Sequence, residues 1–238
     1  DWNLDKDTYN ARYIFSKISL LKNNMIWPEI YKQSNDLMKT DESNNRSEFI
    51  RIYSQYVSKC RESNAMDFDD LLVKTYELFK QNANCLNNYQ ELFKYILIDE
   101  YQDTNKIQDV IIKKIAYKHK NVCVVGDDSQ SIYSFRGANI NNMLHFKKSF
   151  PELIEYKLEQ NYRSTINITN TANSLISHNK NKIEKKIWSN NEEGQKVEII
   201  KFESHIDEGE KTAQIINKLT NNNICLLYTS DAADELRS

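Results

Sequence analysis

From residue 95 onward the chain alternates short apolar runs with amphipathic segments, and this alternation limits the possible fold more than any other feature. It predicts strands at residues 95–99, 121–127 and 153–160, with helices at 105–118 and 139–150 between them. Strands that alternate with helices of this length need crossover connections, which place the strands parallel to one another. The sequence therefore predicts an α/β protein built on a parallel sheet.

The chain before residue 92 has the pattern of hydrophilic helices. Residues 49–62 place apolar side chains at the three- and four-residue spacing of a helix, and residues 66–82 repeat that pattern. We expect Asp67 or Asp69 to lie at the N-terminus of the second helix, where a carboxylate suits the helix dipole. The aromatic side chains are expected to form a core, and residues 39–48 a mobile polar loop.

A third segment begins near Thr165. It predicts a helix at 166–179, a basic connector at 180–188, a strand at 197–202 and a helix at 208–219. One strand and two helices cannot close a core alone, so this segment is expected to be the start of a second, incomplete α/β unit.

Acidic side chains directly follow two of the expected strands. Asp99 and Glu100 come after the first strand, and Asp127 and Asp128 come after the second. Because ligands of a parallel sheet bind at the carboxyl ends of its strands, all four acids are expected to lie where a ligand binds. Asp99 and Glu100 are the candidates for a carboxylate that holds Mg²⁺ and a neighbouring base that activates water. A lone Asp-Glu pair is explained equally well by an acidic turn. That turn would cap the helix expected to begin at Asn105, with Thr104 as its cap.

The second strand continues into VVGDDSQSIYSFRGA, which adds an amide, two aromatic rings and an arginine. Gln130 can hydrogen-bond a phosphate or an attacking water. Tyr133 and Phe135 project to the same side if the segment is extended, and exposed rings can stack on bases of single-stranded nucleic acid. Arg136 can contact a DNA phosphate or brace the acids. The alternative is that both rings plug the core beneath a loop.

The third expected strand closes on LEQNYRST. An arginine such as Arg163 can reach a γ-phosphate and stabilise its developing charge, while Tyr162 can stack on a base or sugar. Alone, this pair is weak support, because such an arginine is most often a surface charge. No glycine of the chain is followed by lysine, so the phosphate loop G-x-x-x-x-G-K-S/T does not occur in these residues.

Four stretches in this order, MDFDDLL, ILIDEYQDTN, VVGDDSQSIYSFRGA and LEQNYRST, closely resemble successive motifs of the UvrD/Rep/PcrA-type superfamily 1 DNA helicases. The resemblance implies a parallel-sheet, RecA-like motor core of the P-loop NTPase type, with a helical insertion and the start of a second α/β core. On that division residues 1–66 are the helical insertion, 67–164 the partial first core, 165–224 the incomplete second core, and 225–238 a tail.

The resemblance also implies roles in ATP hydrolysis for the matching residues. Asp99 would hold Mg²⁺, and Glu100 would be the catalytic base. Gln130 would sense the γ-phosphate and couple it to DNA, Arg163 would touch that phosphate, and Tyr162 would line the nucleotide cleft. ATP and Mg²⁺ are therefore the implied cofactors.

For DNA, the resemblance implies that Tyr133 and Phe135 lie on the single-stranded DNA track, with Arg136 beside them. Many family members carry tryptophan where this chain has Phe135, a departure that keeps a stacking face but weakens it. The family moves 3′ to 5′ on single-stranded DNA towards a duplex junction, in repair or replication. The formal charge of the chain is only -2, so nucleic-acid binding must rest on these local groups.

The family's phosphate loop and adenine-contacting motif would precede residue 1, and its later motifs would follow residue 238. We therefore expect an internal fragment that neither hydrolyses ATP nor unwinds DNA alone. Residues 225–235 also resemble a translated sequencing adapter, so the natural sequence is expected to end near Ile224; a native strand with a polar turn is the competing interpretation. No apolar run could span a bilayer and no signal peptide is apparent, which predicts a cytoplasmic protein without membrane contact.

Three other functions stay open at this point. The chain could be the helicase part of a helicase-nuclease, or a non-catalytic module that binds single-stranded DNA. It could also be a metal-dependent phosphohydrolase, whose acids would be Asp99, Asp103, Asp127 and Asp128. Such an enzyme would leave the glutamine, aromatic and arginine residues of the later motifs unused. The sequence does not indicate the pathway, the oligomeric state or the protein partners.

Overall fold

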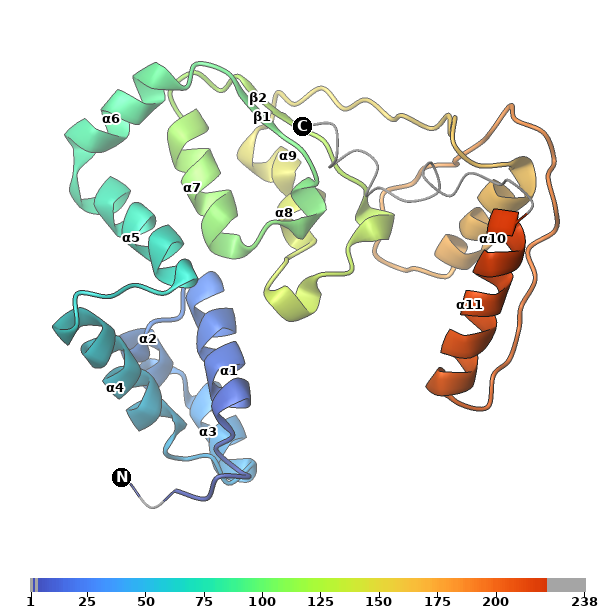
Figure 1. Ribbon diagram of the computed structural model, residues 1–238. Helices are drawn as coiled ribbons and strands as arrows, with labels where there is room; N and C mark the ends of the chain where they lie inside the picture. The colour runs from blue at the N-terminus through green and yellow to red at the C-terminus, as the bar shows by residue number, and fades with distance from the viewer. Residues whose placement is uncertain (1, 3, 222–238) are drawn as a thin grey trace. The chain divides into compact units, whose positions relative to one another are not determined.

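The computed structural model describes residue 2 and residues 4–221 of the chain (Figure 1). These residues form two compact units. The first runs to Glu159 and also includes Ile176–Lys186, and the second contains Gln160–Leu175 and the chain from Ile187 onward. The predicted tail at 225–238 lies outside the described residues.

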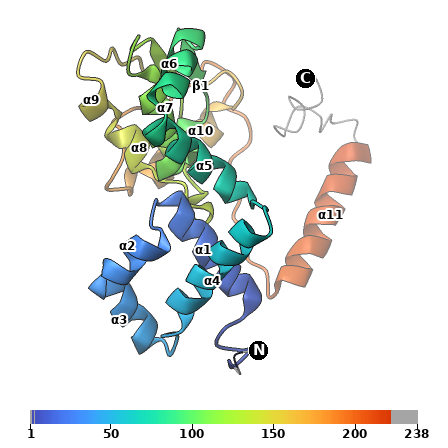
Figure 2. The ribbon, with the colours of Figure 1, turned by 90° about the vertical axis from the view of Figure 1, so that its left-hand side faces the viewer.

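Four helices form the N-terminal part of the first unit, and they stay grouped together in both views (Figures 1 and 2). They are α1 Ala11–Asn23, α2 Pro28–Gln33, α3 Asn35–Ser43 and α4 Phe49–Glu62. Their core is a cluster of buried apolar side chains from α1, α2 and α4: Ile14, Ile18, Leu21, Tyr31, Phe49 and Tyr53. The expectation that the aromatic side chains of α4 form a core is thus confirmed for its two fully buried rings.

The predicted mobile loop at 39–48 is wrong over its first half. Helix α3 continues to Ser43 because Asp41 is buried and needs partners. Its carboxylate forms an ion pair with Lys17 and accepts a hydrogen bond from the Tyr31 hydroxyl. This buried charge fixes the helix against α1 and α2, which the polar composition of the segment did not reveal.

Helix α5 Phe68–Gln81 begins with a reciprocal capping box, and α6 Ala83–Leu92 follows it. The Asp67 carboxylate accepts the Asp70 backbone N–H at 2.8 Å, and the Asp70 carboxylate accepts the Asp67 N–H at 3.3 Å. Asp67 rather than Asp69 is therefore the cap.

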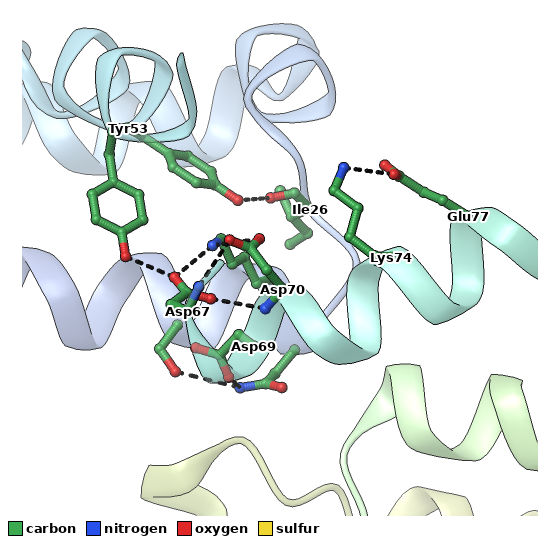
Figure 3. A network of polar contacts seen from close by, with 11 residues as sticks. Ile26, Tyr53, Asp67, Asp69, Asp70, Lys74 and Glu77 are labelled. Carbon is green, nitrogen blue, oxygen red and sulfur yellow. Dashed lines mark hydrogen bonds and ion pairs between the residues drawn. The ribbon is translucent and has the colours of Figure 1, made fainter. Parts of the chain in front are cut away.

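A polar network around Asp67 ties α1 and α4 to the start of α5 (Figure 3). The ammonium group of Lys22, only 3% exposed, lies 2.6 Å from Asp67 Oδ2 and 2.7 Å from Asp70 Oδ1. The Tyr56 hydroxyl donates to Asp67 at 2.7 Å. Burial disfavours the Asp67 carboxylate, but hydrogen bonds from Lys22 and Tyr56 outweigh burial and hold the pKa of Asp67 below its ordinary value.

The sheet consists of β1 Ile96–Ile98 and β2 Val122–Val124, which pair in parallel with Ile96 opposite Val122. Helix α7 Lys106–Ala116 connects them as the predicted crossover. Its cap is Asn105, which exchanges capping-box hydrogen bonds with Gln108, and the expectation of Thr104 was wrong. The Thr104 hydroxyl instead donates to the Tyr101 carbonyl at 2.7 Å, within the preceding turn.

The expected buried strand at 95–99 is only partly covered. Alternate residues of a strand face opposite sides, and Leu97 is 80% exposed on one side, while Ile96 and Ile98 are half-buried on the other. The predicted helix at 139–150 is interrupted at His145 into α8 Asn141–Leu144 and α9 Phe146–Ser149. The interruption brings buried Phe146 edge-on against Tyr101, with ring centroids 5.2 Å apart.

The strands expected at 153–160 and 197–202 do not form. A strand needs a hydrogen-bonded neighbour, and within the described part of the chain β1 and β2 pair only with each other. Alternate apolar side chains of the first segment are therefore exposed, namely Ile154, Tyr156 and Leu158.

The second unit contains most of α10 Ile166–Ser177 and all of α11 His205–Asn221, both at predicted positions. A parallel bridge joins Gln160 to Trp188, next to a 2.7 Å hydrogen bond from Asn161 N to the Trp188 carbonyl. None of the described helices is both long and apolar enough to cross a membrane.

Candidate functional site

The carboxyl ends of β1 and β2 meet at one edge of the sheet. Beyond the paired strands, the Val125 N–H donates to the Ile98 carbonyl at 2.8 Å, and the Tyr101 N–H donates to the Val125 carbonyl at 2.9 Å. This extended pairing places Asp99 and Glu100 beside the chain that continues from β2 to Asp127. Asp99, Glu100 and Asp127 therefore lie at the edge where a parallel sheet binds ligands.

Glu100 adopts a left-handed backbone conformation, with φ 50° and ψ 42°. Residues other than glycine seldom adopt this conformation, because the side chain crowds the backbone. The Asp99 carboxylate stabilises the turn by accepting the Glu100 N–H at 2.9 Å. Both acidic side chains are exposed, so they are available to a ligand at this edge.

Gln102 connects the two strand ends. It lies in the short 3₁₀ helix η1 Tyr101–Asp103 and is 1% exposed. Its side-chain amide donates to Glu100 Oε2 at 2.6 Å, and its side-chain oxygen accepts the Asp127 N–H at 3.0 Å. A Cβ at Gly126 would lie 2.6 Å from this oxygen, so only glycine allows the approach. Gln102 could not be identified from the sequence, because its position between Glu100 and Asp103 gives no indication of its partners.

The Asp127 carboxylate accepts several hydrogen bonds at the start of the VVGDDSQSIYSFRGA motif. It accepts the Ser129 N–H at 2.9 Å and the Gln130 side-chain amide at 3.0 Å, in the 3₁₀ helix η2 Asp128–Gln130. The Lys185 ammonium group lies 2.6 Å from Asp127 Oδ1 and also pairs with buried Asp128. Burial opposes the charge of Asp127, but hydrogen bonds from Lys185 and Gln130 outweigh burial and lower the pKa of Asp127.

The carboxylates at the sheet edge do not form a metal site made of protein ligands alone. Within the described residues, no three His, Cys, Asp or Glu side chains are arranged to hold a metal. Mg²⁺ commonly takes one or two carboxylates and completes its shell with water and phosphate, which exposed Asp99 permits. Asp103 Oδ1 is buried without a hydrogen-bond partner among the described groups. Burial raises the pKa of Asp103, and the charge of Glu100 adds to that effect.

The four-acid phosphohydrolase considered from the sequence is not assembled. Asp127 and Asp128, two of its proposed ligands, are held by Lys185 instead of facing Asp99 and Asp103 as a cluster. This arrangement removes the main support for that function.

The aromatic residues of the VVGDDSQSIYSFRGA motif, Tyr133 and Phe135, lie on the surface. Phe135 is 74% exposed and Tyr133 is 37% exposed, so the interpretation that both rings plug the core is wrong. The segment is also not extended, since Ser134–Arg136 forms the 3₁₀ helix η3. The two ring centroids still lie 6.0 Å apart, with the Arg136 guanidinium 5.0 Å from one and 5.4 Å from the other. Together they present two ring faces and a positive charge.

The aromatic segment is attached directly to the turn after Glu100. Asn105 and Ala138 form an antiparallel bridge, and Gly137 between Ala138 and η3 has φ 90°. Asn23 at the end of α1 packs against Gly137. A Cβ added at Gly137 would lie 3.2 Å from the Cβ of Asn23. The Asn105 side-chain amide donates to Asn23 Oδ1 at 2.8 Å. The two motifs are thus linked through the helical part of the unit.

The LEQNYRST motif lies in the second unit from Gln160 onward. The Tyr162 side chain is 78% exposed, and its hydroxyl donates to Gln160 Oε1 at 2.8 Å. The Arg163 N–H donates to Asn161 Oδ1 at 2.8 Å. Asn161, Tyr162 and Arg163 line a shallow, open hollow. The structure therefore brings Asp99, Glu100 and Gln130 together in one unit, while Tyr162 and Arg163 belong to the other.

Comparison with known families agrees with these motifs. The sequence profile of the UvrD/REP helicase N-terminal domain matches residues 1–151, and that of the UvrD-like helicase C-terminal domain matches residues 156–236. The chain belongs to the UvrD/REP helicase family. Membership implies a RecA-like motor fold, with which the parallel pairing of β1 and β2 is consistent.

Within that family the chain is similar to proteins named ATP-dependent DNA helicase PcrA. It is 41% identical over 209 residues to the one from Leuconostoc citreum. The aligned residues make up 87% of this chain and 27% of that relative. Identity is 37% over 240 residues for Bacillus subtilis and 38% over 235 residues for Staphylococcus aureus, each covering 97% of this chain and 31% of the relative. The chain thus spans less than a third of these relatives.

Proposed function

We propose that this chain is the central part of an ATP-dependent helicase that moves 3′ to 5′ on single-stranded DNA, in DNA repair or replication. One observation carries the proposal. Glu100 and Gln130, which must act on the same phosphate, are connected at one sheet edge through Gln102 and Asp127. The relatives named ATP-dependent DNA helicase PcrA support the same function.

In this proposal Glu100 is the base that activates the attacking water. Gln102 donates to Glu100 Oε2, which leaves Oε1 as the oxygen that takes the proton of the water. Gln130 orients the water or the γ-phosphate, and Arg163 neutralises charge that develops on the phosphate. Asp99 is the residue that would hold Mg²⁺. When bound, the ion neutralises phosphate charge and orients the nucleotide.

Tyr162 would contact the base or sugar of ATP, because its exposed ring offers a stacking face. Tyr133 and Phe135 would stack on bases of single-stranded DNA, with Arg136 contributing a cation close to both rings and to a phosphate. A duplex junction would be the site of strand separation in the parent protein.

The proposal also covers the organisation of the chain. Residues 1–66 would be the helical insertion of the first motor core, 67–164 the remainder of that core, and 165–224 the beginning of the second core. Residues 225–238 would be a tail of foreign origin. The nucleotide sequence tests this last point, because codons that cannot match an adapter would contradict it.

Single-stranded DNA binding tests the proposed DNA track in the chain itself. A labelled oligothymidylate is titrated with the protein, and binding is followed by fluorescence anisotropy. Phe135→Ala should weaken binding about 5- to 150-fold, the factor for losing one stacked base, and Phe135→Trp should strengthen it. Phe68→Ala removes another exposed ring of the same unit and is the matched control. Equal effects of Phe135→Ala and Phe68→Ala would contradict the assignment of the track.

ATP hydrolysis tests the catalytic part of the proposal. The chain alone should show no ATPase activity with or without DNA, because it carries no phosphate loop. The full-length parent should hydrolyse ATP in a DNA-dependent manner and should lose that activity with Glu100→Gln. A source gene without G-x-x-x-x-G-K-S/T before residue 1 would favour a non-catalytic DNA-binding module instead.

A further inference from the structure

The basic connector after α10 packs against the site at the sheet edge. The segment Ile176–Lys186 belongs to the compact unit that contains β1 and β2, although the C-terminal helicase profile already covers it. Two of its backbone N–H groups are fixed by carboxylates, since Ile183 donates to Asp128 at 3.0 Å and Lys186 donates to Glu159 at 3.0 Å. Lys185 therefore lies in an anchored stretch, with its side chain directed to the second motif.

Lys185 serves two acids at once. Its ammonium group is 2.6 Å from Asp127 Oδ1 and pairs with Asp128, while its side chain is only 17% exposed. Burial opposes the charge on Lys185, but hydrogen bonds to Asp127 and Asp128 outweigh burial and raise the pKa of Lys185. The lysine thus holds Asp127 Oδ1 and leaves Asp127 Oδ2 facing the Gln130 amide.

The ionised Asp127 carboxylate determines which end of the Gln130 amide faces it. A carboxylate without a proton only accepts hydrogen bonds, so Gln130 must turn its NH₂ group towards Asp127 Oδ2, at 3.0 Å. The amide oxygen of Gln130 then points away from Asp127. An oxygen at this exposed end can accept a hydrogen bond from an attacking water, whereas a reversed amide would offer two donors.

We propose that Lys185 is a positioning residue for ATP hydrolysis, which fixes the orientation of the Gln130 amide through Asp127. The catalytic consequence rests on the function proposed above for Gln130, but the positioning itself can be measured without ATP. It also means that a residue within the C-terminal helicase profile sets the geometry of a motif within the N-terminal one.

Nuclear magnetic resonance of the 238-residue chain tests the positioning. The side-chain amide signals of Gln130 are identified with Gln130→Glu, which removes them. Lys185→Met should displace these signals and speed their exchange with water about five- to tenfold, the factor expected for losing one hydrogen bond. Lys185→Arg, which keeps the charge, should largely restore them. If Lys185→Met does not fold, Lys185→Gln removes the charge with a smaller change in shape and carries the same expectation.

Two controls separate positioning from general destabilisation. Lys182→Met removes the same charge from the same connector, but Lys182 bonds to the carbonyls of Ile176 and Ser177 instead of an acid. The Gln90 side-chain amide, which donates to the Lys114 carbonyl at 2.7 Å, reports on the fold away from the site. Unmoved Gln130 signals in a folded Lys185→Met chain would overturn the proposal. So would an equal displacement in Lys182→Met.

Steady-state ATPase kinetics of the full-length parent test the consequence. Lys185→Met should lower kcat about tenfold with little change in KM for ATP, and should add little to the loss caused by Gln130→Ala. A loss with Gln130→Ala but none with Lys185→Met would overturn the catalytic role of Lys185. If neither variant changes kcat while Lys185→Met still moves the Gln130 signals, the proposed role of Gln130 fails and the positioning stands.

Discussion

The side-chain amide of Asn105 donates a 2.8 Å hydrogen bond to the side-chain oxygen of Asn23, which lies 82 positions earlier in the chain. Both residues are buried. Asn23 ends α1 and contacts Gly137 after the aromatic segment, while Asn105 caps α7 after the turn that contains Glu100. One hydrogen bond thus joins the helical part of the first unit to both motifs at the sheet edge.

Removing this hydrogen bond should destabilise the first unit as a whole. Asn23→Ala and Asn105→Ala should each lower the free energy of unfolding by about 1 to 3 kcal/mol, since each leaves a buried amide without its partner. The double variant should lose about 1 kcal/mol less than the sum, because the two residues share one interaction. Urea denaturation followed by circular dichroism measures all three values. Asn24→Ala, in a half-buried neighbour whose side-chain amide donates to the Leu20 carbonyl, is the control, and strict additivity would contradict the coupling.

Gln102 should affect catalysis more than ATP binding. In the full-length parent, Gln102→Ala removes the amide that holds Glu100 Oε2 and the oxygen that accepts the Asp127 N–H. We expect kcat to fall about 10- to 100-fold with little change in KM, since one positioned group is lost at the base. Steady-state ATPase measurements check this, with Gln90→Ala as control. A rise in KM with unchanged kcat would show that Gln102 acts on binding instead.

Gly126→Ala should displace the Gln102 side chain and destabilise the first unit. The added methyl group would lie 2.6 Å from Gln102 Oε1 and 3.2 Å from the Tyr101 nitrogen, so Gln102 must move. We expect a loss of about 1 to 3 kcal/mol in the free energy of unfolding, as for overpacking. Gly209→Ala is the matched control. Gly209 lies in α11 with nothing within 4 Å, and alanine favours a helix there, so this variant should unfold at the same or a higher urea concentration.

The Asp67 network should make stability depend on acid. The folded pKa of Asp67 lies below its ordinary value, so the carboxylate stabilises the fold above the unfolded pKa of about 3.9, and this contribution is lost as pH falls through the folded pKa. Asp67→Asn keeps a good helix cap and removes the charge opposite Lys22. At pH 7 it should cost about 1 to 3 kcal/mol.

The difference between Asp67→Asn and the unchanged chain should therefore shrink below about pH 4. Urea denaturation at pH 7, 5, 4 and 3 measures it. Asp7→Asn, in an exposed carboxylate, is the control and should change the curve little. A difference that stays constant down to pH 3 would show that the Asp67 charge is not what stabilises the network.

The local patterns of the sequence were sufficient to predict many elements of this fold. The apolar spacing of residues 49–62 predicted a helix, and the structure has α4 there. The apolar runs at Ile96–Ile98 and Val122–Val124 predicted strands, and both form. Such patterns depend on neighbours along the chain. The strands predicted at 153–160 and 197–202 failed, because a strand also depends on a partner strand that periodicity does not supply.

The candidate site shows the same division. Acids after each strand could be placed at the sheet edge from the sequence, because that edge follows from the topology alone. Gln102 and Lys185 could not be found in this way. Lys185 meets Asp127 from 58 positions away, and Gln102 meets it from 25, so only the folded chain reveals these contacts. The residue type and the sequence neighbours of a side chain do not indicate that it positions another side chain.

The left-handed backbone at Glu100 means that the residue best suited to the fold at this position is not the residue that the proposed chemistry needs. Glycine would adopt φ 50° there without the crowding that a larger side chain meets, a relief of about 1 kcal/mol. It would also discard the proposed base. A directed-evolution screen that rewards heat resistance alone would therefore enrich substitutions at position 100 that improve the fold and abolish turnover.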